Sequence, residues 1–526
     1  MRLGVMKDAE AEKFLLELCP RIGASAPELA RRCGCLPLAL RIAGSFLEVN
    51  RNWSLPEYLE RLQARRLQTL RSADDAESDL ETVFDESYQS LGEDERQKWR
   101  ALSVFPASFD RPAASAVWNM DTPSAHDLLS CFCRYSLLDF LPSPAFGRGG
   151  GGEGEGRYSL HDLLRDFALA RSNGEERETA SQLHAAHYMQ VLSTADDLYL
   201  KGGENILAGL SLFDREAEHI KTGQAWAAGN HARLCKDYPD AGAYVLDLRL
   251  TPGEKIKWLE TALAAARQLK DRSSEGTHLG NLGGAYYSLG DARKAIEFYE
   301  KQLVIAREIG DRRGEGNALG NLGSAYAALG DARKAIEYHE KALVIDREIG
   351  DRRGEGADLG NLGLAYAALG DARKAIEFYE KQLVIVREIG DRRGEGAALG
   401  NLGNAYYSLG DARKAIEYHE KALVVMQEIG DKRAEGSILG NLGLAYAALG
   451  DARKAIEFYE QALVIAREIG DRRGEGNALY NMSNALYGLG EKARGVQLMK
   501  QALAIFEAIE SPHAKWARDK LKEWGA

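Results

Sequence analysis

Residues 311–350 read DRRGEGNALGNLGSAYAALGDARKAIEYHEKALVIDREIG, and this phrase decides the fold of the chain. The other five copies keep the same 40-residue period without insertion or deletion and begin at Asp271, Asp351, Asp391, Asp431 and Asp471. A fixed period of this length indicates stacked units, each too small to bury its own apolar face. We therefore predict a helical solenoid that presents a binding surface.

Each copy contains two stretches of apolar residues at helical spacing. In the copy that begins at Asp311, the first stretch includes Leu319, Leu322, Ala325, Tyr326 and Leu329, and the second includes Ala335, Ile336, Ala342, Leu343 and Ile345. Gly330 can adopt the left-handed conformation that ends the first helix, and Asp331 can cap the second. Each unit is predicted to be a helical hairpin.

Glycine inside the first helix indicates close contact between the two helices of a hairpin. Gly323 costs roughly 1 kcal/mol relative to alanine at such a position, so tight packing must offset it. Together, the residues that resemble the tetratricopeptide (TPR) signature are Leu322, Gly323, Tyr326, Gly330, Ala335 and Ala342. The second helix continues through residues 347–349, as in the long-helix TPRs of kinesin light chains. The resemblance implies an α-α superhelix whose concave face binds a protein or an extended peptide.

The composition of the 526-residue chain does not favour two other classes of function. The formal net charge of −11 is modest for this length and both signs are interspersed, so a general affinity for nucleic acid is not expected. The sequence has no signal peptide and no apolar run of about 18 residues, so we expect no membrane span and no secretion. A cytoplasmic protein is predicted.

Metal binding is not predicted either. The six cysteines precede the repeats, and two pairs have C-x-C rather than C-x-x-C spacing, which favours reduced thiols. His184 and His187 can share a helix face, but no third ligand accompanies them. Two partly exposed histidines are the expected outcome.

Three motifs precede the repeats. They are CGCLPLAL at residues 33–40, LSVFPASF at residues 102–109 and YSLHDLLRDF at residues 158–167. In this order they resemble the GLPL motif of the NB-ARC module of STAND-class signalling NTPases, the start of the winged-helix domain of that family, and its MHD motif. Cys35 stands in place of the first glycine of GLPL, and Leu160 in place of the methionine of MHD. The resemblance implies a helical ARC-like module followed by a winged-helix domain.

The same resemblance implies vestigial nucleotide contacts at Pro37 and His161. In the family, the GLPL proline lies against adenine and the MHD histidine approaches the β-phosphate of ADP. The family holds phosphate with a Walker A loop, G-x-x-x-x-G-K-[ST], and this chain has no such stretch. The resemblance implies that this sequence begins where the P-loop domain of the family would end. We therefore predict no enzyme and no cofactor; an intact parent would be an ATPase, and ADP would bind only together with a missing P-loop domain. Capping of a helix is the alternative role for His161.

The glycine-rich residues 147–156 are predicted to form an extended wing loop, because such a composition cannot bury a core. A winged helix raises DNA binding as a rival function. Its recognition helix is predicted near residues 122–133, which carry no arginine or lysine before Arg134. Phosphate contacts need cations, so nucleic acid is not the expected partner.

The predicted fold is mostly α, and its domains follow one another in a simple order. They are an ARC-like helical module at residues 1–70, a winged-helix domain at 71–175, a helical linker at 176–230, a degenerate TPR at 231–270, six 40-residue TPR units at 271–510, and a C-terminal capping helix at 511–526.

Three positions of the first helix change most between copies, and all three match concave positions of the TPR pattern. The residues at these positions that we expect to contact a partner are Asn317, Ser324, Leu364, Asn404, Tyr407, Leu444, Asn484 and Tyr487. Variation at these positions, against near-identity elsewhere, is what a groove adapted to its partner would show. Drift after recent duplication would give the same pattern.

Most units also begin with two arginines, which should form a row about one repeat apart. Arg313, Arg353 and Arg393 are predicted partner contacts on this row. In one interpretation, acidic neighbours such as Asp311 and Glu315 neutralise the arginines on a solvated edge. In the other, the arginines hold an acidic extended peptide by charge-assisted hydrogen bonds.

These observations favour a non-catalytic interaction protein, a TPR scaffold or sensor within a STAND-type signalling system. The resemblance also allows oligomerisation through a STAND-type assembly. The alternative is an ADP- or ATP-dependent switch whose nucleotide-binding domain lies upstream or on a partner chain. A transcription regulator is the third hypothesis.

Overall fold

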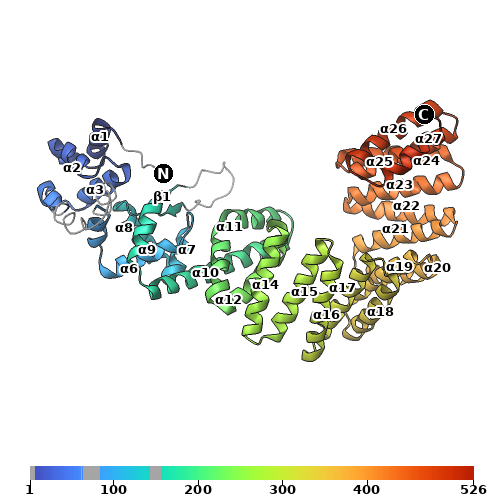
Figure 1. Cartoon of the computed structure of the whole chain (residues 1–526), viewed down its shortest axis with the longest axis horizontal. Coiled ribbons are helices and arrows are strands. Elements are labelled where there is room, and N and C mark those ends of the chain that lie inside the picture. Colours follow the sequence, from blue (N-terminus) through green and yellow to red (C-terminus); the bar gives the residue numbers. More distant parts are fainter. Residues whose placement is uncertain (1–5, 61, 63–82, 143–155) are drawn as a thin grey trace. The chain divides into compact units, whose positions relative to one another are not determined.

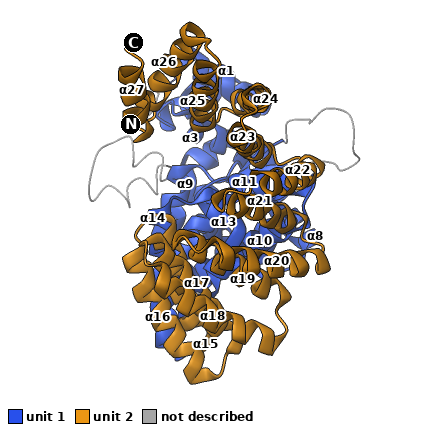
Figure 2. Ribbon diagram, turned by 90° about the vertical axis from the view of Figure 1, so that its right-hand side faces the viewer, with its two compact units in different colours: residues 1–270 blue, residues 271–526 orange. Residues whose placement is uncertain are grey.

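The computed structural model describes residues 6–60, 62, 83–142 and 156–526. The chain divides into two compact units, residues 1–270 and residues 271–526, which Figure 2 colours blue and orange. Both units are mostly helical, which confirms the predicted fold class (Figure 1). The predicted wing loop, apart from Gly156, and residues 63–70 of the predicted first domain lie outside the described residues.

The first unit begins with four short helical segments. They are α1 (Asp8–Leu18), the 3-10 helix η1 (Pro20–Ser25), α2 (Ala26–Arg32) and α3 (Pro37–Val49). Pro37 is the first residue of α3, where its missing N–H leaves no hydrogen bond unmade. Leu36 before it is extended, with φ −82° and ψ 123°, as the proline ring requires. The helix then buries a face that includes Leu40 and Phe46.

Next come short helices combined with a β-hairpin. They are α6 (Glu93–Ala101), the 3-10 helix η2 (Leu102–Val104), α7 (Arg111–Trp118), α8 (Thr122–Arg134), β1 (Asp139–Leu141), β2 (Arg157–Ser159) and α9 (Asp162–Arg171). The two strands are antiparallel, with Phe140 opposite Tyr158, and Phe109 forms a further bridge to Tyr158. Side-chain oxygens of Asp110 and Asp121 cap α7 and α8. Buried residues of α7, α8 and the hairpin, such as Val117, Leu129 and Tyr158, belong to one hydrophobic core.

Longer helices complete the first unit. They are α10 (Gly174–Lys201), α11 (Asn205–Asn230), α12 (Ala232–Ala241), α13 (Ala243–Arg249) and α14 (Pro252–Gln268). Buried ion pairs join these helices to the preceding part. Arg157 of β2 binds Glu216 of α11 at 2.5 Å, and Arg100 of α6 binds Glu176 of α10 at 2.7 Å. Glu216 is 3% exposed, so its pairing with Arg157 offsets the cost of burying a charge.

Helical hairpins follow one another through the second unit (Figure 1). Their helices are α15 (Arg272–Ser288), α16 (Ala292–Ile309), α17 (Arg312–Ala328), α18 (Ala332–Ile349), α19 (Arg352–Ala368), α20 (Ala372–Glu388), α21 (Arg392–Ser408), α22 (Ala412–Ile429), α23 (Lys432–Ala448), α24 (Ala452–Glu468), α25 (Arg472–Gly488) and α26 (Lys492–Ala508). A last helix, α27 (His513–Glu523), packs against α26. Each helix packs against the next along the chain, so the apolar face of one hairpin is buried by its neighbours.

In the first five hairpins, the glycine at the position of Gly323 provides space for one large side chain of the second helix. A Cβ atom at Gly323 would lie 2.6 Å from the ring of His339, and one at Gly363 would lie 2.4 Å from the ring of Tyr379. The close packing that the sequence predicted at Gly323 is therefore an imidazole ring pressed against the helix backbone. In the last hairpin, Ser483 faces the flexible Met499 instead, with its Oγ 3.8 Å from the sulfur atom.

Glycine followed by aspartate separates the helices. Gly330 has a φ of 79° and Gly350 a φ of 71°, a conformation that glycine adopts without steric cost. The side chain of Asp331 then accepts a hydrogen bond from the backbone N–H of Lys334, which caps α18. No helix among the described residues combines the length and the low polarity that crossing a membrane requires.

Candidate partner-binding groove

The candidate groove is the face of the first helices, and it is best defined between α23 and α25. A cavity of about 260 Å³ lies there. Its wall includes Arg433, Ser437, Asn441 and Leu444 of α23 and Asn477 and Asn481 of α25, and its floor includes Ala462, Ile465 and Ala466 of α24. The α23 residues follow one another at spacings of four, four and three, which places them on one helix face. The equivalent positions of the other units occupy the same face of their own helices.

The predicted contact residues before the last hairpin have side chains that solvent reaches. Asn317, Leu364, Asn404 and Tyr407 are exposed, and Ser324 and Leu444 are half-buried. Leu364 and Tyr407 expose 52% and 39% of their surface, a large fraction for apolar and aromatic side chains. Leu444 contributes to the cavity wall. These positions can therefore contact a ligand without any change in the packing of the hairpins.

The two predicted contacts in the last hairpin have partners within the chain. Nδ2 of Asn484 donates to the carbonyl oxygen of Tyr480 at 3.0 Å. The ring of Tyr487 stacks on Trp524, with 3.9 Å between the ring centroids and 4° between the planes. The segment after α27 thus covers one face of Tyr487.

Asparagines at a fixed position of the first helix also belong to this face. They are Asn281, Asn321, Asn361, Asn401, Asn441 and Asn481. Nδ2 of Asn441 lies 3.1 Å from Oδ1 of Asn404, so one amide orients the other. This row was not predicted from the sequence, because the prediction rested on positions that vary between copies. Their placement four residues after Asn317 and three before Ser324 was the signal that could have revealed them.

The first arginine of each pair has a structural role. Arg312 binds Glu315 on its own helix and also Glu348 of α18, at 3.2 Å for the Nε to Oε1 pair. Glu315 is 8% exposed and also accepts from Nε of Arg307 at 2.7 Å. Burial alone would raise the pKa of Glu315, but the hydrogen bonds from Arg307 and Arg312 outweigh it and hold the pKa below its usual value. This arginine links consecutive helices of the stack.

The second arginine of each pair lies on the groove side. Arg313, Arg353 and Arg393 are exposed, and Arg433 at the equivalent position contributes to the cavity wall. Arg393 reaches Asp431 of the next unit at 2.9 Å. Among the residues that the structure describes, Arg313 and Arg353 form no ion pair. The two arginines of a pair thus differ, because consecutive helical residues point about 100° apart.

The two residues expected to contact nucleotide lie at helix starts. Pro37 is exposed at the first position of α3. His161 is also exposed and precedes α9, where its Nδ1 accepts a hydrogen bond from the backbone N–H of Leu163 at 3.2 Å. His161 therefore caps α9, which is the alternative role that the sequence allowed.

The prediction of two partly exposed histidines was wrong for His184, which is 1% exposed. Its Nε2 lies 3.3 Å from Nδ1 of His219, whose Nε2 lies 3.0 Å from the carbonyl oxygen of Ser108. Burial, helped by the neighbouring His219, lowers the pKa of His184 to about 3, so the ring stays neutral. In the described segments, no group of three or more His, Cys, Asp or Glu side chains is arranged to hold a metal ion.

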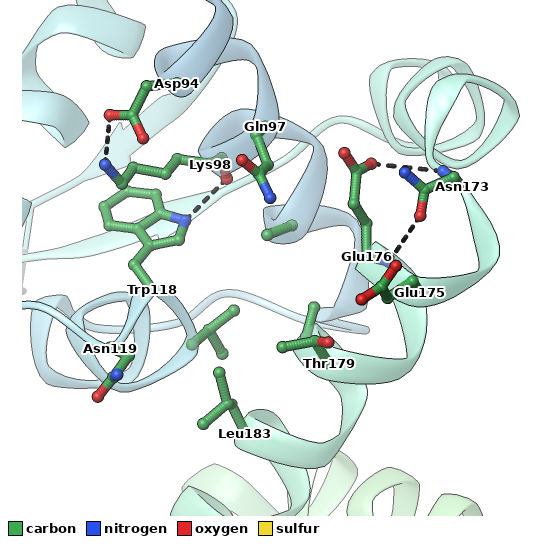
Figure 3. Close-up of a pocket in the computed structure, with 13 residues that line it drawn as sticks. Asp94, Gln97, Lys98, Trp118, Asn119, Asn173, Glu175, Glu176, Thr179 and Leu183 are labelled. Carbon is green, nitrogen blue, oxygen red and sulfur yellow. Dashed lines mark hydrogen bonds and ion pairs between the residues drawn. The ribbon is translucent and has the colours of Figure 1, made fainter.

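A second cavity, of about 540 Å³, lies in the first unit between α6, α7 and α10 (Figure 3). Three charged side chains of its wall are paired with one another or with neighbours. Lys98 binds Asp94, and the carboxylate of Glu176 binds Arg100. Trp118 donates from Nε1 to the carbonyl oxygen of Lys98 at 2.7 Å. Because these charged side chains already have partners within the chain, we consider the groove of the second unit the stronger candidate site.

Comparison with known families identifies the second unit. Residues 274–348, 355–428 and 434–508 match the family described as tetratricopeptide repeat. These residues are tetratricopeptide repeats.

Two curated relatives are named regulatory protein AfsR. The one from Streptomyces coelicolor is 29% identical over 204 residues, which are 38% of this chain and 18% of the relative. The one from Streptomyces griseus is 28% identical over 226 residues, 41% of this chain and 21% of the relative. The chain therefore matches about a fifth of the length of these relatives.

Solved structures are also similar to this chain. A STAND protein with a tetratricopeptide repeat sensor from Pyrococcus horikoshii is 20% identical, with a TM-score of 0.48, over 99% of this chain and 74% of that protein. BtubC from P. vanneervenii is 26% identical, with a TM-score of 0.39, over 42% of this chain and 92% of that protein. A Rap protein complexed with competence and sporulation factor is 14% identical, with a TM-score of 0.40, over 66% and 97% of the two chains.

Proposed function

We propose that the chain is a non-catalytic scaffold or sensor that captures an extended peptide, or an extended segment of a protein, along the first helices of its repeats. The observation that carries this proposal is the cavity between α23 and α25, two of whose polar wall residues recur: Arg433 has an equivalent arginine in four other units, and Asn441 an equivalent asparagine in all of them. A ligand that follows the groove would meet this asparagine at each unit and the arginine at most units. An extended peptide fits this arrangement, because its backbone repeats the same peptide group along its length.

The residue types on the groove face suit a peptide. Asparagine amides, such as Asn401 and Asn441, both donate and accept hydrogen bonds, as peptide groups do. The varied positions, such as Asn404 and Tyr407, would then distinguish one peptide side chain from another. The exposed arginines at the second position, such as Arg353, favour a peptide that carries acidic residues, because hydrogen bonds between guanidinium and carboxylate are charge-assisted.

We further propose that the first unit is the ARC-like module and winged-helix domain of a STAND-type protein, followed by a helical linker and a degenerate repeat. The order of α7, α8, β1 and β2 supports the winged helix, and the helix that starts at Pro37 supports the GLPL-like motif. In this proposal the repeats sense a partner and the first unit couples that event to signalling. Nucleotide would enter only through a P-loop domain, which is the alternative of an ADP- or ATP-dependent switch.

DNA binding is a second candidate function, because the curated relatives are named regulatory proteins. In a winged helix the recognition helix would be α8. That helix has Asp121 as its cap and its one basic residue, Arg134, in the last turn. Such a helix offers little to backbone phosphates. Retention of the full chain on DNA at low salt would support this candidate, and loss of retention in a variant with Arg134→Glu would locate it.

The main proposal is tested by partner capture. The full chain carrying Asn404→Ala and Tyr407→Ala should lose most of the partner that the unaltered chain retains from a cell extract, while its helical melting curve stays nearly unchanged. Val424→Ala provides a matched control, because Val424 is 54% exposed on α22, the second helix of the same unit. Equal loss with the control, or a melting curve lowered together with capture, would assign Asn404 and Tyr407 to packing.

A further inference from the structure

The second helices differ at one position that faces a glycine of the first helix. In two units this position is glutamine, and its side chain lies over the glycine. A Cβ atom at Gly280 would lie 2.7 Å from Nε2 of Gln302, and one at Gly360 would lie 2.5 Å from Nε2 of Gln382. In the other units the position is alanine, as at Ala342, Ala422, Ala462 and Ala502, and the unit of Ala502 has Tyr480 in place of the glycine. The glutamine fills the space above the glycine, and alanine leaves it open.

Two of the alanine units contain open space of this kind. No atom lies within 4 Å of a Cβ atom placed on Gly400 or on Gly440, which face Ala422 and Ala462. In the unit that contains Ala342, the carboxylate of Asp358 approaches the glycine, at 3.4 Å from a Cβ atom on Gly320. The missing glutamine therefore creates room at Gly400 and at Gly440.

The mouth of that space differs between the two units. Between α21 and α23 it is bridged, because Arg393 binds Asp431 at 2.9 Å and Asn441 binds Asn404 at 3.1 Å. Between α23 and α25 the equivalent Arg433 and Asp471 both contribute to the wall of the 260 Å³ cavity. Within the described residues no ion pair joins these two side chains. The cavity that contains Gly440 and Ala462 is thus open to a ligand.

The unit at residues 431–470 has this cavity because it carries alanine where the other units of its type carry glutamine. Units with the pair Phe-Tyr in the second helix, at residues 298–299 and 378–379, carry the filling glutamine. The unit with Phe458 and Tyr459 belongs to the same type but carries Ala462. The cavity therefore distinguishes this unit from the other Phe-Tyr units, and it lies at one place along the groove.

The wall of the cavity determines which side chain suits it. Arg433 supplies a positive charge that no ion pair among the described residues neutralises. Oδ1 of Asn477 lies 3.3 Å from Nδ1 of His513, which leaves the Nδ2 of Asn477 to donate. The carboxylate of Asp471 accepts from the backbone N–H of Gly474 at 3.0 Å and is committed to the cap of α25. Alanine and isoleucine of α24 form an apolar floor that suits methylene groups.

We propose that this cavity is a specificity pocket for one acidic side chain, aspartate or glutamate, of the peptide that lies in the groove. The carboxylate binds Arg433 and the Nδ2 of Asn477, and the methylene part rests on Ala462 and Ile465. The pocket fixes the register of the peptide on the repeats, because units with a filled floor offer no equivalent space. This inference rests on the proposed peptide binding and names the side chain that one site selects.

The chain itself supplies the variant that closes the pocket. Ala462→Gln places at residue 462 the glutamine that Gln382 provides in the same type of unit, where it fits against a glycine without disturbing the fold. Ala422→Gln is the matched control, since it makes the same change one unit earlier, where the mouth is already bridged. Melting curves of both variants should stay close to that of the unaltered chain.

The probe is a random peptide library displayed on phage and selected on the full chain. The unaltered chain should enrich peptides with Asp or Glu at one fixed position. Ala462→Gln and Arg433→Gln should each reduce that enrichment about tenfold or more, as expected for loss of a charge-assisted contact. Ala422→Gln should retain it.

Two results would overturn the inference, and they are distinguishable. If peptides are enriched and depend on Asn404 and Tyr407, but no position selects an acid or Ala462→Gln behaves like Ala422→Gln, the pocket assignment alone is wrong. If no peptide is enriched at all, the proposed peptide binding fails together with it.

Discussion

Nδ1 of His339 lies 2.9 Å from Oδ1 of Asp358, and both side chains are buried between α18 and α19. Asp346 lies beside Asp358 and is 8% exposed. At the position of Asp346, the other units have apolar residues, such as Ala306 and Val386. A histidine and two carboxylates thus lie together at one interface between repeats, and one of the carboxylates, Asp346, replaces an apolar residue of the other units.

Asp346→Ala should stabilise the second unit at neutral and alkaline pH. Burial, and next the charge of Asp358, raises the pKa of Asp346 to about 7 from its ordinary value of 3.8. A raised pKa in the folded state means that stability is lost as the pH rises from about 4 to about 7. The melting temperature of the variant should therefore exceed that of the unaltered chain at pH 8, and the gain should shrink towards pH 5. Asp346→Asn, which removes the charge and keeps the size, should act similarly. A lower melting temperature of both variants at pH 8 would contradict this.

Two glycines of α21, three residues apart, should respond to alanine in opposite ways. A Cβ atom on Gly403 would lie 2.5 Å from the ring of His419, whereas nothing lies within 4 Å of one on Gly400. Gly403→Ala should destabilise the chain by about 1–3 kcal/mol through overpacking. Gly400→Ala should stabilise it by roughly 0.5–1 kcal/mol, because alanine is the better helix former. Chemical denaturation of the two variants measures both, and the same sign for both would show that His419 can move away at little cost.

The row of ion pairs that links consecutive helices contains a weaker contact between α22 and α23, and a substitution there should strengthen it. Glu435 accepts from Nε2 of Gln427 at 3.0 Å and from Nζ of Lys432 at 2.8 Å, where Glu395 accepts from Arg387 and Arg392. Gln427→Arg should raise stability by a few tenths to about 1 kcal/mol at low salt.

High salt should reduce the gain from Gln427→Arg, because part of it is electrostatic and exposed to solvent. Gln427→Met, which adds no charge, is the control. If melting curves show equal gains for both variants at every salt concentration, then packing and not charge explains the effect.

How much of this could be predicted from the sequence differs between features. The hairpins followed from helical spacing, and the tight packing at Gly323 followed from the cost of glycine. The identity of the ring against Gly323 did not, because Tyr and His alternate at that position along the array. The roles of Arg312 and Arg313 could not be separated either, since the partner Glu348 lies 36 residues away on the next helix. Such a contact depends on how the two helices of one hairpin pack against each other, which periodicity alone does not give.

The cavity at Ala462 was also beyond sequence reasoning of this kind. The positions predicted to contact a partner all lie on first helices, whereas the open space depends on a small residue of the second helix opposite Gly440. The asparagine row was missed for a related reason, because identity between copies was taken as packing. In a binding groove, an invariant polar residue can instead serve the invariant part of the ligand, its backbone.

His161 should act as a helix cap and not as a nucleotide contact in this chain. Its Nδ1 accepts from the backbone N–H of Leu163, so His161→Ala should lower the stability of the first unit by about 0.5 kcal/mol or more. His161→Asn should preserve stability, because asparagine is a good cap residue. Titration of the unaltered chain with ADP should raise its melting temperature little, since ligand binding to the folded state would appear as a concentration-dependent rise. A clear rise that His161→Asn abolishes would instead assign His161 to a nucleotide site, and the same rise in both proteins would locate nucleotide elsewhere.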